Sequence, residues 1–173
     1  MIEAGFSNQS ENLEPIKIGS VHTSEPDHVV VITQDGNPII ELWFYLKDET
    51  NCFKDIKISN QYVVIGCGHK VSFVNIISKE VITHDLKRSY FGHLYPVYDI
   101  ESKFFDKQII VASSNCLYLY TEQGSLVWSS VELGVDGVVV SNISNGIISG
   151  SGECDPPGGW IDFMLELKSG NVI

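Results

Sequence analysis

Residues 146–160, GIISGSGECDPPGGW, form the densest run of turn residues in the chain and hold two carboxylates beside an aromatic side chain. Glu153, Asp155 and the nearby Asp162 could place oxygen atoms around a hard cation such as calcium, although the spacing does not match a DxDxDG loop. Trp160 could anchor a partner, because tryptophan contributes strongly to interfaces. We therefore predict a binding site at Glu153, Asp155, Trp160 and Asp162. The alternative is that this run only shapes a turn, with solvated acids and an indole ring packed over the adjacent strand.

Other reactive side chains lack the neighbours that their chemistry needs. Cys67 and His69, in GCGH, could ligate zinc or form an activated thiolate, but no further ligand stands at a helpful spacing. His84 and Asp85, with His93 nearby, could partner a nucleophile, but no G-x-S-x-G elbow is present. The glycines form no G-x-G-x-x-G before a helix. We expect no catalytic residue, no metal and no cofactor, and predict that the protein is not an enzyme.

The net charge of the chain limits which classes of partner it can bind. Its 22 acidic and 11 basic residues give a net charge of -11. Such a chain repels phosphate backbones and anionic membrane surfaces, so we expect neither nucleic acid nor membrane as a partner. Residues 108–167 contain seven acidic residues and no lysine or arginine. This region would attract and steer a basic protein partner. The alternative is that the acidity only keeps the protein soluble.

The cysteines and the first residues bear on the cellular compartment. The four cysteines form no CxxC pair, and their scatter is typical of free, half-buried thiols. The first 15 residues have neither a basic n-region nor an apolar h-region, which a secretory signal requires. No run approaches the ~18 apolar residues of a membrane span. We predict a reduced, cytoplasmic protein.

The elements that must position these residues are predicted to be β-strands. Residues 1–15 are polar and acidic and end at a proline, so we expect a flexible leader there. Residues 28–33 (HVVVIT) and 38–46 flank an Asp-Gly pair, which is a strong hairpin signal because both residues tolerate positive φ. We find no convincing amphipathic helix. Residues 16–173 are expected to form a single all-β repeat domain.

A pattern with a period of roughly 40 residues repeats along the rest of the chain. The units span residues 55–86, 99–133 and 136–173. Each unit opens with an aspartate and a short strand, continues with an apolar strand that ends in small residues, and then has an alternating strand, a polar turn and a last short strand. Four short strands per unit are typical of the blades of β-propellers.

The units resemble β-propeller blades of the quinoprotein type, most clearly at QIIVASSNCLYLYTEQGSLVW, residues 108–128. The last unit departs from that pattern by an insertion, ECDPPGG, between its second and third strands. The tail also resembles small uncharacterised bacterial proteins that end in a DPPGGW segment. The resemblance implies a propeller-like fold with three to four antiparallel β-blades in one domain. The alternative is a two-sheet β-sandwich made from the same strands.

These observations lead to two hypotheses about function. The first is a non-catalytic protein-interaction module that binds a basic partner through loops on a rigid frame, by analogy similar to an immunity-like bacterial protein. The second is a small-ligand or carbohydrate-binding domain, assisted by calcium. In that case Trp160, Tyr118 and Tyr120 would serve as platforms, with Glu153 and Asp155 beside them.

Overall fold

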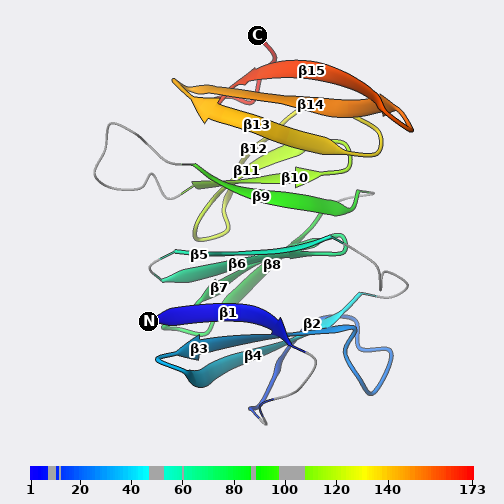
Figure 1. The fold of residues 1–173 in the computed structure, drawn as a ribbon. Coiled ribbons are helices and arrows are strands. Elements are labelled where there is room, and N and C mark those ends of the chain that lie inside the picture. The colour runs from blue at the N-terminus through cyan, green and yellow to red at the C-terminus, as the bar shows by residue number, and fades with distance from the viewer. Residues whose placement is uncertain (8–10, 12, 47–52, 60, 87–88, 98–107) are drawn as a thin grey trace.

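Fifteen strands and no helix make up the computed structural model in the residues that it describes, which are 1–7, 11, 13–46, 53–59, 61–86, 89–97 and 108–173. The strands form four separate small sheets, which we name A to D in chain order (Figure 1). The protein is therefore all-β, as predicted. The two-sheet sandwich is wrong, because the strands divide into four sheets. The described part of the chain contains no helix with the length and apolar character that a membrane crossing requires.

Sheet A contains the predicted hairpin. Its strands are β1 (Ile2–Ser7), β2 (Ile16–Gly19), β3 (His28–Gln34) and β4 (Asn37–Tyr45), in the order β1-β3-β4-β2. At the turn between β3 and β4, Asp35 and Gly36 have φ angles of 51° and 80°. Positive φ at both central residues fits the twist of a tight hairpin. Strand β2 runs parallel to β4, so sheet A is mixed.

The expectation of a flexible leader over residues 1–15 is wrong for its first half. Strand β1 pairs antiparallel with β3 along its whole length. Ile2, Ala4 and Phe6 alternate with exposed or small residues and pack against the apolar layer between sheets A and B. The polar composition of the segment hid this period-two alternation, which is the signal of a strand with one buried face.

Sheets B and C each have four antiparallel strands that follow chain order from one edge to the other. Sheet B contains β5 (Lys54–Ile58), β6 (Tyr62–Cys67), β7 (Lys70–Asn75) and β8 (Val81–Asp85). Sheet C contains β9 (Phe91–Val97), β10 (Gln108–Ser113), β11 (Leu117–Thr121) and β12 (Leu126–Ser129). Strand β9 comes before Asp99, where the sequence pattern placed the start of the second unit. Asp99 itself lies outside the described residues.

Sheet D has three strands, β13 (Val138–Ser144), β14 (Ile147–Asp155) and β15 (Gly159–Glu166). The predicted insertion forms the end of the β14–β15 hairpin, with its turn at residues 156–158. Beyond β15 the chain turns back, and Val172 forms an isolated bridge with Leu165. This bridge places the last described residues beside β15.

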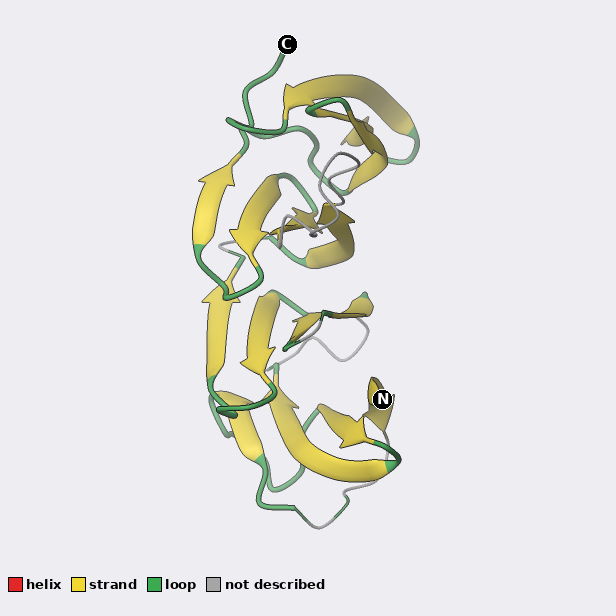
Figure 2. Cartoon of the chain, turned by 90° about the vertical axis from the view of Figure 1, so that its left-hand side faces the viewer, coloured by secondary structure: helices red, strands yellow, loops and turns green. Residues whose placement is uncertain are grey.

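The four sheets stack face to face in chain order along an arc, with sheets A and D at its two ends (Figures 1 and 2). The first strands β1, β5, β9 and β13 lie next to one another along the concave side of this arc. Each of them is an edge strand of its sheet. The segments that lead into β5, β9 and β13 are therefore brought together by the stacking.

Three apolar layers fill the spaces between neighbouring sheets. The layers contain Leu42 and Ile65 between sheets A and B, Phe73 and Val111 between B and C, and Ile110 and Leu165 between C and D. Sheets B and C are buried on both faces, which explains why their inner strands are continuous apolar runs instead of alternating ones. The predicted strands at 62–66 and 108–113 are of this kind.

Candidate functional site

The four residues that the sequence singled out all lie on the β14–β15 hairpin of sheet D. Glu153 of β14 and Trp160 of β15 are direct cross-strand partners, and Asp162 follows two residues after Trp160. Because side chains alternate between the two faces of a strand, Glu153, Trp160 and Asp162 share one face. Asp155 stands at the exposed turn, opposite Gly159 and beyond a bulge.

Glu153 ties the hairpin to the segment that precedes β13. Its Oε1 atom accepts a hydrogen bond from the backbone N–H of Gly158 across the turn, at 2.6 Å. Its own N–H donates to the carbonyl oxygen of Gly137 at 2.8 Å, and its carbonyl oxygen accepts from the N–H of Val135 at 2.7 Å. The carboxylate is therefore held in place by the backbone around it.

The indole ring of Trp160 lies over Gly137. A Cβ atom placed on Gly137 would be 3.3 Å from the Cη2 atom of the ring, and 4.0 Å from Oε2 of Glu153. The glycine thus lets the ring approach the backbone closely. The side chain of Trp160 is still 45% exposed. The ring is supported on one side and open to solvent on the other, which is the geometry of a preformed contact surface.

Tyr90 and Asp136 extend this surface toward sheet C. The hydroxyl of Tyr90, just before β9, donates to the Oδ1 atom of Asp136 at 2.8 Å and also contacts its backbone carbonyl oxygen. Burial, the hydrogen bond with Asp136 and the negative charges of Asp136 and Glu153 raise the pKa of Tyr90 to about 12. Tyr90 therefore remains a protonated donor at neutral pH.

Phe53 adds a second exposed ring. It stacks on Tyr90 with a centroid distance of 6.3 Å and an interplanar angle of 23°, and it packs at a tilt against His93. Phe53 is 56% exposed. We refer to Phe53, Tyr90, Trp160, Asp136 and Glu153 together as the aromatic rim.

The sequence alone did not assign Phe53, Tyr90 or Asp136 to a site. Each of them lies one or two residues before the first strand of its sheet, which is β5, β9 or β13. These three strands are neighbours on the concave side of the arc. A shared position before the first strand of each unit is the only signal that could have indicated the cluster.

A shallow groove of about 500 Å³ continues from the rim between β5 and β9. His93, which contacts Phe53, lines this groove together with Asp55, Lys57 and Tyr95. The Oδ1 atom of Asp55 accepts from the N–H of Ile56 at 2.8 Å and from Nζ of Lys57 at 3.0 Å.

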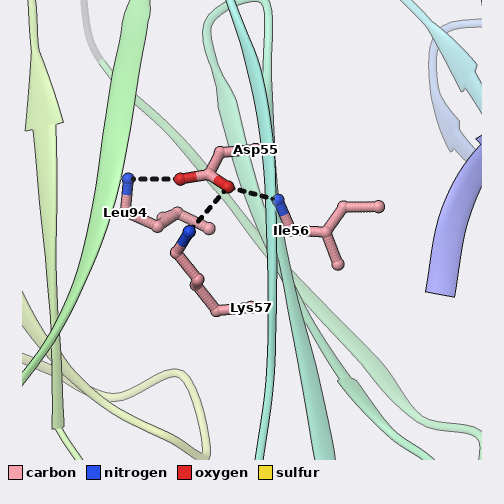
Figure 3. Close-up of polar contacts among 4 residues, drawn as sticks. All are labelled: Asp55, Ile56, Lys57 and Leu94. Atoms are coloured by element: carbon pink, nitrogen blue, oxygen red, sulfur yellow. Dashed lines mark hydrogen bonds and ion pairs between the residues drawn. The ribbon is translucent and has the colours of Figure 1, made fainter. Parts of the chain in front are cut away.

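The second oxygen of Asp55 bridges two sheets. Its Oδ2 atom accepts from the backbone N–H of Leu94 on β9, at 3.1 Å (Figure 3). Asp55 thus joins the first strand of sheet B to the first strand of sheet C, and Lys57 balances its charge. We interpret this carboxylate as a structural tie in the wall of the groove.

The other candidate residues have structural surroundings. The Nε2 atom of His84 bonds to the carbonyl oxygen of Gly124 at 2.7 Å, whereas Asp85 forms an ion pair with Lys70. His84 and Asp85 are therefore directed to different partners and do not act as a pair. Cys67 is fully buried. Among the described residues, no three His, Cys, Asp or Glu side chains gather closely enough to hold a metal ion.

Of the two tyrosines named in the carbohydrate hypothesis, Tyr120 belongs to the interior and Tyr118 is partly buried beside it. Tyr120 is only 3% exposed and packs against Phe73 and His84 between sheets B and C. Tyr118 is half-buried and stacks on Tyr120. Burial raises the pKa of both hydroxyl groups, to about 12 for Tyr120. Tyr120 cannot serve as a surface for a sugar ring in this arrangement.

The rim combines aromatic faces with carboxylates and offers no paired nucleophile and base. Aromatic faces attract cations through their quadrupole, and carboxylates attract them by charge. The arrangement therefore suits the recognition of an ammonium or guanidinium group.

The chain matches no protein-family model and no curated protein. Its functional assignment therefore depends on the geometry of the site alone.

Proposed function

We propose that this protein is a non-catalytic interaction module that binds a lysine- or arginine-containing segment of a protein partner at the aromatic rim. The observation that supports this proposal best is a continuous series of contacts: the exposed Phe53 stacks on Tyr90, Tyr90 bonds to Asp136, and the exposed ring of Trp160 lies over Gly137 beside Glu153. Nothing in this cluster requires a cofactor.

The distribution of charge also supports a basic partner. The seven acidic residues in 108–167 lie in sheets C and D and their connections, and five of them are exposed: Glu132, Asp136, Asp155, Asp162 and Glu166. No lysine or arginine in that range neutralises them. A surface of one sign steers a partner of the opposite sign and raises the rate of association at low ionic strength.

A contact between a cation and an aromatic ring also occurs within the described part of the chain. The ammonium group of Lys54 lies 5.1 Å from the ring centroid of Phe6, so this lysine is directed toward sheet A and away from the rim. The ring of the neighbouring Phe53 is exposed, so a cation of a partner could lie over it. A cation over an exposed aromatic ring contributes about 0.5–1 kcal/mol, and about 2 kcal/mol when it is desolvated.

We further propose that the four sheets are propeller-like blades in an open arc. Stacking with the first strands along the concave side supports this interpretation. In such a frame the segments between blades are fixed by the sheets, so the rim would be preorganised for binding. An immunity-like role in a reducing cytoplasm is one setting in which an acidic module of this kind would act, and it remains a proposal by analogy.

Selection from a display library of random heptapeptides tests the proposed function. We expect enrichment of lysine and arginine, and affinities that fall steeply when the salt concentration rises from about 0.05 to about 0.5 M. The Trp160→Ala and Phe53→Ala variants should each lose about 0.5–2 kcal/mol of binding free energy, roughly 2- to 30-fold in Kd.

A matched control is Ile77→Ala, which removes a highly exposed side chain at the β7–β8 turn, outside the rim. Its affinity for the selected peptides should equal that of the parent protein. Selection of acidic or neutral peptides, or equal losses for Ile77→Ala and Trp160→Ala, would show that the rim is not a site for cationic segments.

A further inference from the structure

The groove between β5 and β9 continues a row of rings that begins at the aromatic rim. The ring of Phe53 contacts those of Tyr90 and His93, at centroid distances of 6.3 and 5.8 Å. The ring of His93 in turn lies 6.1 Å from that of Tyr95. Pro96 adds its own ring to the groove lining. Because both strands belong to the inner sheets B and C, this row lies within the stack and offers apolar faces over several residues of a ligand.

The wall of the groove that β9 forms offers no free strand edge. The N–H of Leu94 points away from sheet C and is already bonded to Asp55 of β5 (Figure 3). Backbone groups alternate between the two sides of a strand, so the next outward position is Pro96, which has no N–H. Proline on an edge strand protects it against the addition of another strand. A β-strand is therefore a poor occupant of this groove.

The groove supplies hydrogen-bond donors and has little acceptor capacity left. Both oxygens of Asp55 already accept hydrogen bonds. Lys57 has further N–H groups beyond its bond to Asp55. The hydroxyl of Tyr95 accepts from the N–H of Val140 at 3.3 Å, and its own proton has no acceptor among the described residues. Burial raises the pKa of Tyr95, so the hydroxyl remains a donor at neutral pH. A ligand rich in carbonyl oxygens and poor in N–H groups suits such a groove.

The charges of the groove and of the rim differ. In the groove, Lys57 and Asp55 form an ion pair at 3.0 Å and neutralise each other. At the rim, Asp136 and Glu153 belong to the part of the sequence that has no lysine or arginine. A bound segment would therefore place its cation at the rim and uncharged residues in the groove.

A polyproline II segment combines these requirements. Its carbonyl groups make no internal hydrogen bonds, and its prolines have no N–H, so its backbone offers mainly acceptors. Proline-rich segments dock in aromatic-lined grooves and lose little entropy, because the helix is already formed. The step of 5.8–6.3 Å between neighbouring rings equals about two residues of such a helix, which rises about 3.1 Å per residue. The row of rings accommodates at most about six residues.

We propose that the groove between β5 and β9 binds a proline-rich segment of the partner protein in the polyproline II conformation, with a lysine or arginine at one end of the segment lying at the aromatic rim. This inference rests on the proposed function and adds the composition and conformation of the bound segment. The prolines pack against the rings of His93 and Tyr95, and the donors of the groove bond to the carbonyl oxygens of the segment.

Two peptides of equal length and charge test this binding mode. The probe is Ac-KPPPPPPK-NH2, whose prolines impose polyproline II and carry no N–H. The control is Ac-KTVTTVTK-NH2, which favours a β-strand. Lysines at both ends allow either direction of binding. We expect the probe to bind about tenfold more tightly in calorimetric titrations and to shift the amide resonances of β5 and β9. Equal affinities, or tighter binding of the control, would overturn the proposal.

A pair of histidine substitutions provides the complementary test. His93→Ala removes an exposed ring from the row, whereas His22→Ala removes an exposed histidine ring before β3, outside the groove. Affinity for Ac-KPPPPPPK-NH2 should fall about 2- to 12-fold in His93→Ala, as for the loss of one aromatic contact, and stay unchanged in His22→Ala. Circular dichroism checks that both variants fold. If the affinity of a folded His93→Ala variant equals that of the parent protein, the groove is not the binding site.

Failure of this inference and failure of the proposed function give different results. If both peptides bind equally well, and binding weakens with salt and in Phe53→Ala, the rim recognises cations and only the polyproline II inference is wrong. If neither peptide binds and the random library yields no basic sequence, the proposed function fails as well.

Discussion

Replacing Asp55 by alanine should weaken the junction between sheets B and C. The side chain is 22% exposed and accepts three hydrogen bonds (Figure 3). The bonds from Ile56 and Lys57 are local to β5, whereas the bond from the N–H of Leu94 crosses to β9. Only the last of these links two sheets.

The magnitude follows from the kind of bond that is lost. A hydrogen bond to a charged group contributes about 1.5–3 kcal/mol, whereas an exposed ion pair such as that with Lys57 contributes about 0–1 kcal/mol. We therefore expect the free energy of unfolding to fall by about 1.5–3 kcal/mol in Asp55→Ala. For a chain of this size, each kcal/mol lowers Tm by about 2–4 °C, so Tm should fall by about 3–12 °C.

Urea and thermal unfolding followed by circular dichroism measure this loss, and amide hydrogen exchange locates it. The N–H of Leu94 should exchange faster in Asp55→Ala, because its acceptor has been removed. Lys57→Met is the control, since it removes the ion pair and keeps the bond between the sheets. An equal loss of stability in the two variants, or unchanged protection of the Leu94 amide, would refute this assignment.

Two further predictions concern packing and pH. In Gly66→Ala, the new Cβ would lie 2.0 Å from the ring of the fully buried Phe91, so the free energy of unfolding should fall by about 1–3 kcal/mol; Gly5→Ala, with nothing within 4 Å, is the matched control and should change little. Burial, and secondarily Lys54, lowers the pKa of His28 below its usual 6.5. As pH falls below 6.5, His28 is therefore protonated in the unfolded chain before it is protonated in the folded protein. The contribution of His28 to the free energy of unfolding is fully present above pH 6.5, and it should be lost as pH falls from there through the lower pKa of the folded state. Denaturant titrations between about pH 8 and about pH 5 should show a shallower decline in His28→Gln, and an unchanged slope would contradict the role of His28.

Much of the local structure could be predicted from the sequence. The hairpin around Asp35 and Gly36 was predicted correctly, because two adjacent residues that tolerate positive φ define a tight turn by themselves. The all-β class followed from short apolar runs with period two and from the absence of helical periodicity. The first strand was missed because Ile2, Ala4 and Phe6 alternate within a polar segment.

The candidate site could be predicted only in part. The sequence drew attention to Glu153 and Trp160, which are neighbours across one hairpin and hence close in the chain. It gave no reason to associate them with Phe53 or Tyr90, which come from segments far away in the sequence. Tyr120 was expected at the surface, but an alternating pattern does not show that both faces of a sheet are covered.

The amino-acid sequence by itself therefore determined the strands, the turns and the excess of negative charge, because these depend on residues close together in the chain or on composition. The tertiary structure alone decided which strands became edges, and that the segments before β5, β9 and β13 meet. The physical reason is that sheet stacking depends on how whole apolar faces fit together. No short stretch of sequence contains that information, so Phe53, Tyr90 and Trp160 join one surface only when the sheets are packed.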